Sequence, residues 1–335
     1  RRIQIGQSLA HRVVQAARVD IAQRIGREVS EQPYRPMHVL QDTVRRFSNA
    51  DFPGLETVLK TYLADQGGVC PTAACVAVAG PVRDGAATMT NLDWTVDRDT
   101  LMRATQAKTV AILNDLQAQG HAIGDLDNSS IKQIVAGPKT PPNEKAVRLV
   151  VGVGTGFNAA PVYETSGGRF VPPSEAGHAN LPIRTDQDFR LCRYVSNAHG
   201  FPAIEDVLSG RGLEKVYAFL AQEDGTPREA SAQAIMAACE NETDPHAREA
   251  AALFSRLLGT VCGNLSLIQL PFGGVYLVGG VARALAPYLT QCGFAEAFRD
   301  KGRFAGFMSN FAVSIVEDDY AALIGSASHI ENLRE

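Results

Sequence analysis

Two polar residues, Asn114 and Asp115, directly follow a short apolar run at residues 109–113. The run has the length and composition expected for a buried strand of a parallel sheet. Ligands in open α/β sheets bind outside the carboxyl ends of such strands. A carboxylate at that position can accept a proton from an alcohol, and the neighbouring amide can hold a second hydroxyl. The alternative is structural, because Asn and Asp are also preferred N-cap residues of helices.

A glycine-rich segment contains Gly152, Gly154, Thr155 and Gly156. Glycines at alternate positions let the backbone turn sharply and approach a phosphate without interference from Cβ atoms. The segment also imitates a dinucleotide-binding fingerprint, but that turn must open a helix. Residues 157–163 are typical of a strand and contain a proline, which would interrupt a helix. We therefore predict a turn between two strands that contacts a nucleotide phosphate; an ordinary tight hairpin is the alternative.

Three further segments carry residues that suit ligand binding. Glu175 can accept hydrogen bonds from two vicinal hydroxyls, and His178 can serve a neighbouring one. Glu205 begins an acidic pair at the start of a helix or turn. Gly279 and Gly280 follow an apolar run, where an adenosine could lie against the backbone. Each segment also has a structural alternative. The segment with Glu175 and His178 could be a plain loop, and that with Glu205 a helix start or solvated surface. The glycines at 279 and 280 could serve close packing of a strand on a helix.

Alternating strands and helices would position these residues. Apolar runs predict strands at residues 38–47, 75–80, 87–91, 109–113, 147–151, 157–163, 274–278 and 313–317. Helices are predicted to begin near residues 53, 97, 245 and 320. The longest has Asp244 as its N-cap and Pro245 at its first position. Its apolar stripe is formed by Ala250, Phe254, Leu257, Val261, Leu265 and Ile268.

Residues 1–36 differ from the rest of the chain. They contain seven Arg and no Lys. Their apolar positions recur at roughly helical spacing, which predicts one or two amphipathic helices. These positions are Leu9, Val13, Val14, Ala17, Ile21 and Ile25.

Composition and charge exclude several classes of protein. The 335 residues suffice for two linked domains, and a hydrophobic content of 45% with 20% charged residues argues against disorder. The net charge is −4 and no long basic tract is present, so no nucleic-acid partner is expected. No apolar stretch approaches the roughly 18 to 20 residues that span a bilayer. Because the six cysteines lack zinc-ligand spacing, we expect a cytoplasmic protein with buried, reduced thiols.

Taken together and in order, these segments resemble the bacterial glucokinase family of the actin/hexokinase/Hsp70 superfamily. The resemblance covers roughly residues 38–332 and includes residues 78–82, 89–94, 113–115, 152–156, 175–178, 205–210, 272–280, 300–304 and 323–327. It implies an α/β, two-lobed actin-like ATPase (ribonuclease H-like) fold with a central cleft. The implied small domain comprises residues 1–125 plus 317–335, and the large domain comprises residues 126–316. The related repressor and sugar-kinase group is a poorer match, because its cysteine zinc site is absent.

The resemblance also implies a reaction: ATP-dependent phosphorylation of glucose, or a close hexose, to glucose 6-phosphate. Asp115 would be the general base and Mg²⁺ the metal cofactor, although no metal ligand can be named. The implied sugar-binding residues are Asn91, Asn114, Asp115, Glu175, His178 and Glu205. The implied nucleotide-binding residues are Gly152, Gly154, Thr155, Gly156, Gly279 and Gly280. A homodimer is implied as well.

One motif of the family is not found in this sequence. Family members begin with a strand and a turn of the form Asp-x-Gly-Gly-Thr-Asn, which is their first phosphate clamp. Three explanations are open: a natural replacement that removes activity, a damaged or misread reading frame, or a strand in an unfamiliar form. Under the first, the protein is a sugar-binding pseudokinase or regulator, which is the alternative function.

Overall fold

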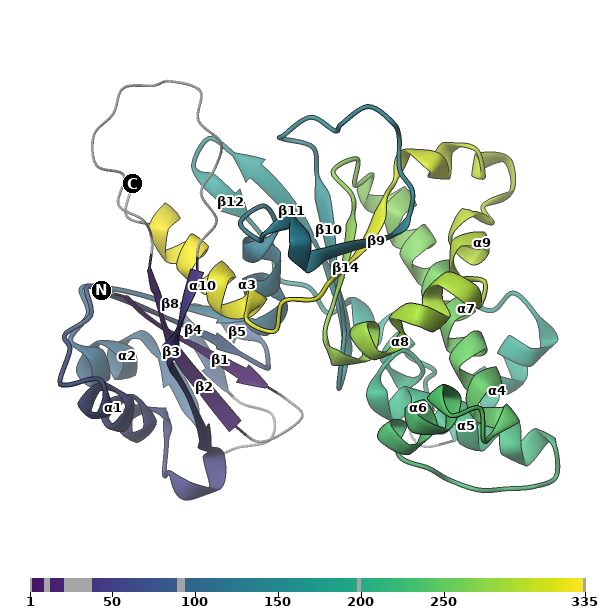
Figure 1. The fold of residues 1–335 in the computed structure, drawn as a ribbon, viewed down its shortest axis with the longest axis horizontal. Helices are drawn as coiled ribbons and strands as arrows, with labels where there is room; N and C mark the ends of the chain where they lie inside the picture. The colour runs from purple at the N-terminus through teal and green to yellow at the C-terminus, as the bar shows by residue number, and fades with distance from the viewer. Residues whose placement is uncertain (1, 9–12, 21–37, 89–93, 198–199, 334–335) are drawn as a thin grey trace. The chain divides into compact units, whose positions relative to one another are not determined.

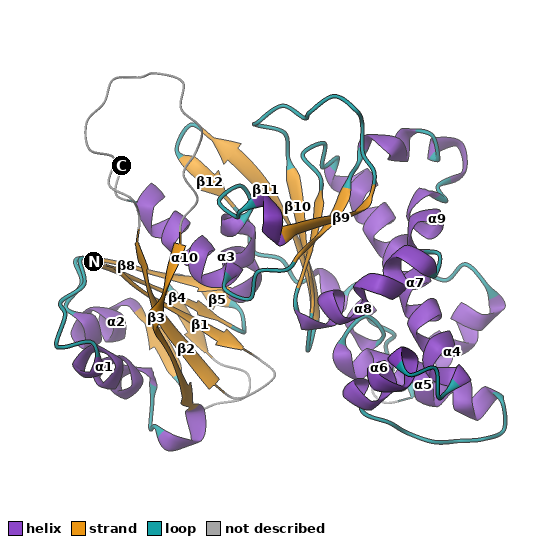
Figure 2. Ribbon diagram, in the orientation of Figure 1, coloured by secondary structure: helices purple, strands orange, loops and turns teal. Residues whose placement is uncertain are grey.

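The computed structural model describes residues 2–8, 13–20, 38–88, 94–197 and 200–333 (Figure 1). The chain divides into two compact units. The first comprises residues 1–130, 164–173 and 318–335, and the second comprises residues 131–163 and 174–317. Both units combine strands with helices, which makes this a mixed α/β fold, as predicted (Figure 2).

The first unit is built on a five-stranded sheet in the order β3-β2-β1-β4-β8. Strand β1 is parallel to β4 and antiparallel to β2, and β4 is parallel to β8. A smaller sheet has the order β5-β6-β7. The strands are β1 (Arg2–Ser8), β2 (Val13–Asp20), β3 (His38–Ser48), β4 (Ala73–Val78), β5 (Val82–Arg83), β6 (Ala86–Thr88), β7 (Thr95–Asp97) and β8 (Thr109–Asn114).

Helices cover both faces of this five-stranded sheet (Figure 1). Successive residues of a strand face opposite sides, and β4 is buried along its whole length. Its residues 74, 76 and 78 pack with α1 (Leu55–Asp65) and α2 (Arg98–Thr105). Its residues 73, 75 and 77 pack with α3 (Asp115–Ala122) and α10 (Ala321–Asn332). A Cβ atom on Gly325 of α10 would lie only 1.7 Å from the carbonyl oxygen of Ala118 in α3.

Strands, and not helices, occupy the described part of residues 1–36. Strand β1 pairs with β2 from Arg2 opposite Val19 to Ser8 opposite Val13, and it also pairs with β4. The predicted amphipathic helix is therefore wrong at Val13, Val14 and Ala17, because pairing within the sheet overrides the weak local helical pattern. The other positions of that prediction, Leu9, Ile21 and Ile25, lie outside the described residues. The segment supplies a strand in an unfamiliar form, which was the third explanation. Residues 9–12, between the two strands, lie outside the described residues.

The second unit contains a sheet with the order β11-β10-β13-β14-β9, continued at the β11 edge by β12. Strand β13 is parallel to both of its neighbours, β10 and β14. At the two sides of this trio, β11 is antiparallel to β10 and β9 is antiparallel to β14. The strands are β9 (Ile131–Val135), β10 (Arg148–Val153), β11 (Phe157–Thr165), β13 (Val275–Val278) and β14 (Val313–Val316). Strand β12 (Gly168–Phe170) and the last two residues of β11 fall within residues 164–173, which are counted with the first unit. The helices are α4 (Asp186–Ser196), α5 (Gly210–Glu223), α6 (Ala232–Glu240), α7 (Pro245–Gln269), α8 (Gly280–Gln291) and α9 (Phe294–Arg299).

Helix α7 runs through the core of the second unit. The Asp244 side chain accepts the His246 N–H at 3.0 Å, which confirms the predicted N-cap. Most of the predicted apolar stripe is buried, but Ile268 in the last turn is 70% exposed, so the stripe ends before that residue. By length and composition α7 could also cross a membrane. However, 67% of its most apolar window is buried in the unit, as in the core helix of a globular domain.

All six cysteines are free thiols. Cys75, Cys192, Cys239 and Cys262 are buried, as expected, whereas Cys70 is exposed. Burial raises the pKa of Cys75 and that of Cys262 to about 12, so both thiols stay protonated at neutral pH. Their role is therefore in packing.

Candidate functional site

In the first unit, Asn114 and Asp115 stand where β8 passes into α3. Asn114 is the N-cap of α3, because its Oδ1 accepts the Leu116 N–H at 2.9 Å. Its Nδ2 donates to the carbonyl of Gly80 at 3.0 Å. The Asp115 Oδ1 also accepts the Leu116 N–H, at 2.8 Å. The capping alternative is thus confirmed for Asn114, and the same contacts fix the Asp115 carboxylate at the carboxyl end of a buried strand.

Gln117 completes the capping box of α3. Its Oε1 accepts the Asn114 backbone N–H at 3.1 Å, while its Nε2 donates to the carbonyl of Val171 at 2.9 Å. The first turn of α3 is therefore held both by its own cap and by residues 164–173, which belong to the same unit. A catalytic side chain needs such support, because small displacements of a reacting group reduce rates strongly.

In the second unit, the glycine segment joins two antiparallel strands. Val153 of β10 pairs with Phe157 of β11, and the Gly154 N–H donates to the Gly156 carbonyl at 2.9 Å. No helix begins at this turn, which excludes the dinucleotide-binding fingerprint and confirms the predicted strand-turn-strand structure. A Cβ atom on Gly154 would meet no atom within 4 Å, so this part of the turn is open.

Glu205 contacts this glycine turn directly. It lies in a 3₁₀ turn (Ile204–Asp206), and its Oε2 accepts the Phe157 N–H at 3.0 Å. A Cβ atom on Gly156 would lie 2.4 Å from the same Oε2, so only glycine allows this approach. Its Oε1 is 3.9 Å from the Nη2 of the exposed Arg211 side chain, and so long an ion pair with an exposed partner contributes little stability. The neighbouring Asp206 has a separate role, because it binds Lys215 at 2.7 Å.

Two helices begin beside the glycine turn. The Gly210 N–H, at the start of α5, donates to the Gly154 carbonyl at 2.8 Å. Gly279 precedes α8, and a Cβ atom there would lie 2.5 Å from the Val153 carbonyl oxygen and 3.4 Å from the Gly154 nitrogen. Its φ of 106° is itself a conformation that favours glycine. Helix N-termini attract anions, so the turn lies where a phosphate would be stabilised.

The segment with Glu175 and His178 packs against the start of β11. The Asn158 side chain donates through Nδ2 to the Ser174 carbonyl and accepts the Ala176 N–H at 3.0 Å. The Glu175 Oε2 and His178 Nε2 atoms are 3.9 Å apart. Their side chains are 59% and 67% exposed, so both are available to a ligand.

Three of the predicted motifs therefore converge within the second unit. A Cβ atom on Gly177 would lie 2.1 Å from the Phe157 carbonyl oxygen and 3.4 Å from the Glu205 Cβ. Residues 152–156, 175–178 and 205–210 thus share one edge around the β10–β11 turn, together with Gly279. The first unit carries the pair at residues 114 and 115. Asn91 lies outside the described residues.

Among the described residues of this region, Asn158 is a contact-forming residue that the sequence prediction missed. The sequence offers only a weak signal for it, a polar residue within an otherwise apolar strand at residues 157–163. Its partners at residues 174 and 176 are recognisable only once the chain is folded.

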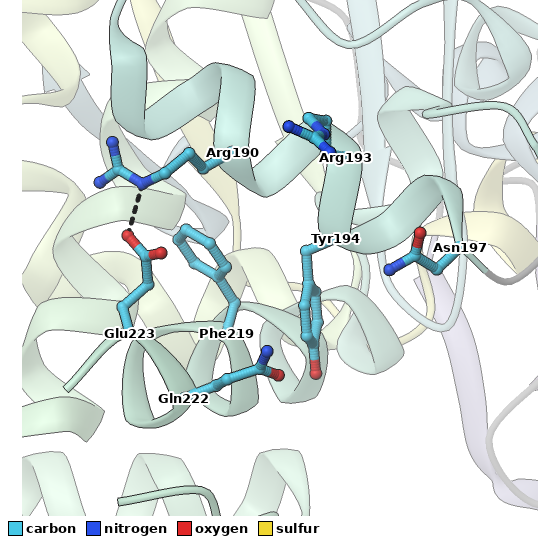
Figure 3. A pocket seen from close by; sticks show the side chains of 7 residues that line it. All are labelled: Arg190, Arg193, Tyr194, Asn197, Phe219, Gln222 and Glu223. Atoms are coloured by element: carbon cyan, nitrogen blue, oxygen red, sulfur yellow. Dashed lines mark hydrogen bonds and ion pairs between the residues drawn. The ribbon is translucent and has the colours of Figure 1, made fainter. Parts of the chain in front are cut away.

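A separate hollow lies between α4 and α5 (Figure 3). It is lined by Arg190, Arg193, Tyr194, Asn197, Phe219, Gln222 and Glu223. Arg190 binds Glu223 across its rim at 2.6 Å. It contains none of the predicted site residues. Among the residues that the structure describes, no group of three or more His, Cys, Asp or Glu could hold a metal ion.

A family model described as Glucokinase matches residues 30–333. This chain belongs to the glucokinase family. A Glucokinase from Saccharophagus degradans is 32% identical over 294 residues, covering 87% of this chain and 90% of that protein. The resemblance inferred from the sequence motifs is therefore confirmed.

Solved glucokinase structures share the fold. Glucokinase from an Antarctic psychrotroph superposes with a TM-score of 0.84 at 26% identity, covering 99% of this chain and 98% of that one. Balamuthia mandrillaris glucokinase, solved in complex with glucose, superposes with a TM-score of 0.75 at 21% identity, covering 98% and 92%. The predicted actin-like ATPase type of fold is thus confirmed for this glucokinase-family chain.

Proposed function

We propose that this member of the glucokinase family transfers the γ-phosphoryl group of ATP to the terminal hydroxyl of glucose, with Asp115 as the general base. The observation that carries the proposal is the convergence of three motifs in the second unit. A carboxylate, a histidine and a second carboxylate lie beside an open glycine turn that is flanked by two helix N-termini. Groups that suit a polyol thus adjoin groups that suit a phosphate.

Each half of the proposed site has a distinct role. Glu175, His178 and Glu205 bind sugar hydroxyls, and Asn91 and Asn114 assist them. Gly152, Gly154, Thr155 and Gly156 bind the phosphates of ATP, and Gly279 and Gly280 lie by its adenosine. We take the first unit as the small domain, close to residues 1–125 plus 317–335, and the second as the large domain.

Magnesium enters this proposal as part of the substrate MgATP. Mg²⁺ is usually held by one or two carboxylates together with substrate phosphates and water, and not by a protein cage. Bound Mg²⁺ would neutralise charge on the phosphates.

The reaction needs one proton transfer and accurate positioning. The glucose hydroxyl oxygen forms a bond to the γ-phosphorus while the bond to ADP breaks, and the hydroxyl proton passes to an Asp115 carboxylate oxygen. Phosphoryl transfer requires little covalent help from a protein, so alignment supplies much of the rate. The contacts of Asp115 and Asn114 with the first turn of α3 would contribute to that alignment by holding the proposed base in place.

Asp115→Asn tests the assigned base. We expect wild-type protein with glucose and MgATP to form glucose 6-phosphate, and the variant to lose about 10²- to 10⁴-fold in kcat. Glucose binding by calorimetry is expected to stay within a few-fold. Asp99→Asn is the matched control, because Asp99 is an exposed acidic residue in the first turn of α2.

The outcomes separate the two functions considered. Undiminished turnover by Asp115→Asn would refute the assigned base. Saturable glucose binding by the wild type without any product would instead support the sugar-binding pseudokinase. By family resemblance we also propose a cytoplasmic homodimer, and sedimentation as a single chain would exclude the dimer.

A further inference from the structure

Asn158 makes an unusual set of contacts for a strand residue. It is the second residue of β11 and is partly buried. Its Nδ2 donates to the carbonyl of Ser174, and its Oδ1 accepts the N–H of Ala176 at 3.0 Å. One amide group thus holds the backbone immediately before and immediately after Glu175. The Oδ1 atom also accepts the Ala159 N–H at 2.8 Å, which fixes the amide on its own strand.

We propose that Asn158 is a positioning residue for hexose binding, which aims Glu175 and His178 by clamping the backbone on both sides of Glu175. The inference rests on the proposed function, because it assumes that Glu175 and His178 bind sugar hydroxyls. It adds a residue that has no direct contact with the sugar and acts through its neighbours.

The positions that the Glu175 carboxylate can reach depend on where its backbone is held. Its side chain is 59% exposed, and its Oε2 lies 3.9 Å from the His178 Nε2. An exposed carboxylate of this kind is free to adopt several rotamers, so the position of its Cα decides where it can reach. A 3₁₀ turn (Ala176–His178) follows directly, and the Ala176 N–H held by Asn158 is its first. The clamp therefore fixes the backbone from which both proposed sugar-binding side chains extend.

Phe157, the residue before Asn158 in β11, contacts the far end of the segment formed by residues 174–177. Gly177 packs so closely on Phe157 that an added Cβ atom would lie 2.1 Å from the Phe157 carbonyl oxygen. Residues 157 and 158 of β11 thus hold residues 174–177 through steric contact and through the Asn158 amide. A binding group that is held in place before the ligand arrives loses less entropy on binding, which raises affinity.

Only a side-chain amide of this length satisfies both contacts. The Ser174 carbonyl requires a donor and the Ala176 N–H requires an acceptor. Alanine at position 158 removes both. Ionised aspartate keeps the acceptor but places an oxygen against the Ser174 carbonyl, and protonated aspartate restores the donor.

The test compares Asn158→Ala with Asn310→Ala in the full-length protein. Asn310 is a fair control, because its partly buried Nδ2 also donates to a backbone carbonyl, that of Phe307 at 2.8 Å. For Asn158→Ala we expect KM for glucose, and its calorimetric Kd, to rise about 10-fold, or about 1.4 kcal/mol. KM for ATP is expected to change less than twofold. Asn310→Ala is expected to leave both constants unchanged.

Two further variants distinguish positioning from general support of the fold. In a Glu175→Ala background, we expect Asn158→Ala to raise KM for glucose by a smaller factor than it does alone, because one of the two groups that it positions is gone. For Asn158→Asp, we expect the ratio of its glucose KM to that of wild type to fall as the pH is lowered from 8 towards 5. A ratio independent of pH would count against the donor role.

The failure of this inference can be told apart from failure of the proposed function. A wild-type protein that binds no glucose would overturn both. A wild-type protein that binds and phosphorylates glucose, with Asn158→Ala at the wild-type KM, would overturn the positioning role alone. The positioning role would also be overturned if Asn158→Ala raised KM for glucose by the same factor in the Glu175→Ala background as in the wild type.

Discussion

Replacing Gly156 by alanine isolates the contact between the glycine turn and Glu205. The new methyl group would lie 2.4 Å from the Glu205 Oε2, whereas ordinary contacts begin at 3.4 Å. The carboxylate must therefore retreat by about 1 Å, the difference between these distances. The hydrogen bond from the Phe157 N–H, now 3.0 Å long, would then exceed bonding distance.

The size of the effect follows from what the carboxylate loses. A hydrogen bond to a charged group contributes about 1.5 to 3 kcal/mol, and about 1.4 kcal/mol is a factor of ten. If displaced Glu205 loses one such bond to the sugar, KM for glucose rises about 10- to 100-fold. The fold itself is expected to survive, because the methyl group meets the end of a flexible side chain and not backbone.

Steady-state kinetics, with glucose and ATP varied separately, would give the two KM values of Gly156→Ala. Thermal melting would show whether the variant remains folded. Gly306→Ala is the matched control, because an added Cβ atom there would meet nothing within 4 Å and its φ is −65°. A glucose KM within twofold of wild type would refute the proposed role of Glu205. A change in KM for ATP with no change in KM for glucose would also refute the proposed role of Glu205 in binding glucose.

Two predictions concern the stability of the first unit. Gly325→Ala places a methyl group 1.7 Å from the Ala118 carbonyl oxygen, so we expect a loss of about 3 kcal/mol in urea unfolding; a loss below about 1 kcal/mol would contradict the packing of α10 on α3. Burial, reinforced by the charges of His329 and Arg169, lowers the pKa of His121 from 6.5 to about 3. His121 then takes up a proton only on unfolding, so the free energy of unfolding falls as the pH drops below 6.5. This residue contributes about 1 kcal/mol of that fall between pH 6.5 and 5.5. His121→Phe is expected to flatten the profile by that amount, and an unchanged profile would disprove the shift.

Local patterns predicted much of the fold. Buried strands such as β4, β8 and β10 are short apolar runs, and α7 has both an N-cap and a proline at its start. Each of these signals lies within a few residues of sequence. The strand after the glycine turn was also predictable, because the proline that excluded a helix lies close by.

The rest depended on contacts between distant residues. Strand β1 has alternating Ile3 and Ile5, but its place in the sheet comes from β4, about seventy residues along the chain, through pairs such as Arg2 with Ala73. Glu205 reaches the turn from a sequence separation of 48 residues. No local pattern encodes such a contact, and the same is true of Asn158 with residues 174 and 176.

The order in which the chain is made has a consequence for its folding. All residues of the second unit precede residue 318, whereas the first unit also needs α10, whose Ala321–Asn332 are synthesised later. Side chains of α10 close one face of the β4 layer, and Gly325 allows the helix to seat on α3. The core of the first unit is therefore completed only when this last helix joins strands that are made early in the chain, and a shortened chain without α10 would expose apolar surface on that face of β4.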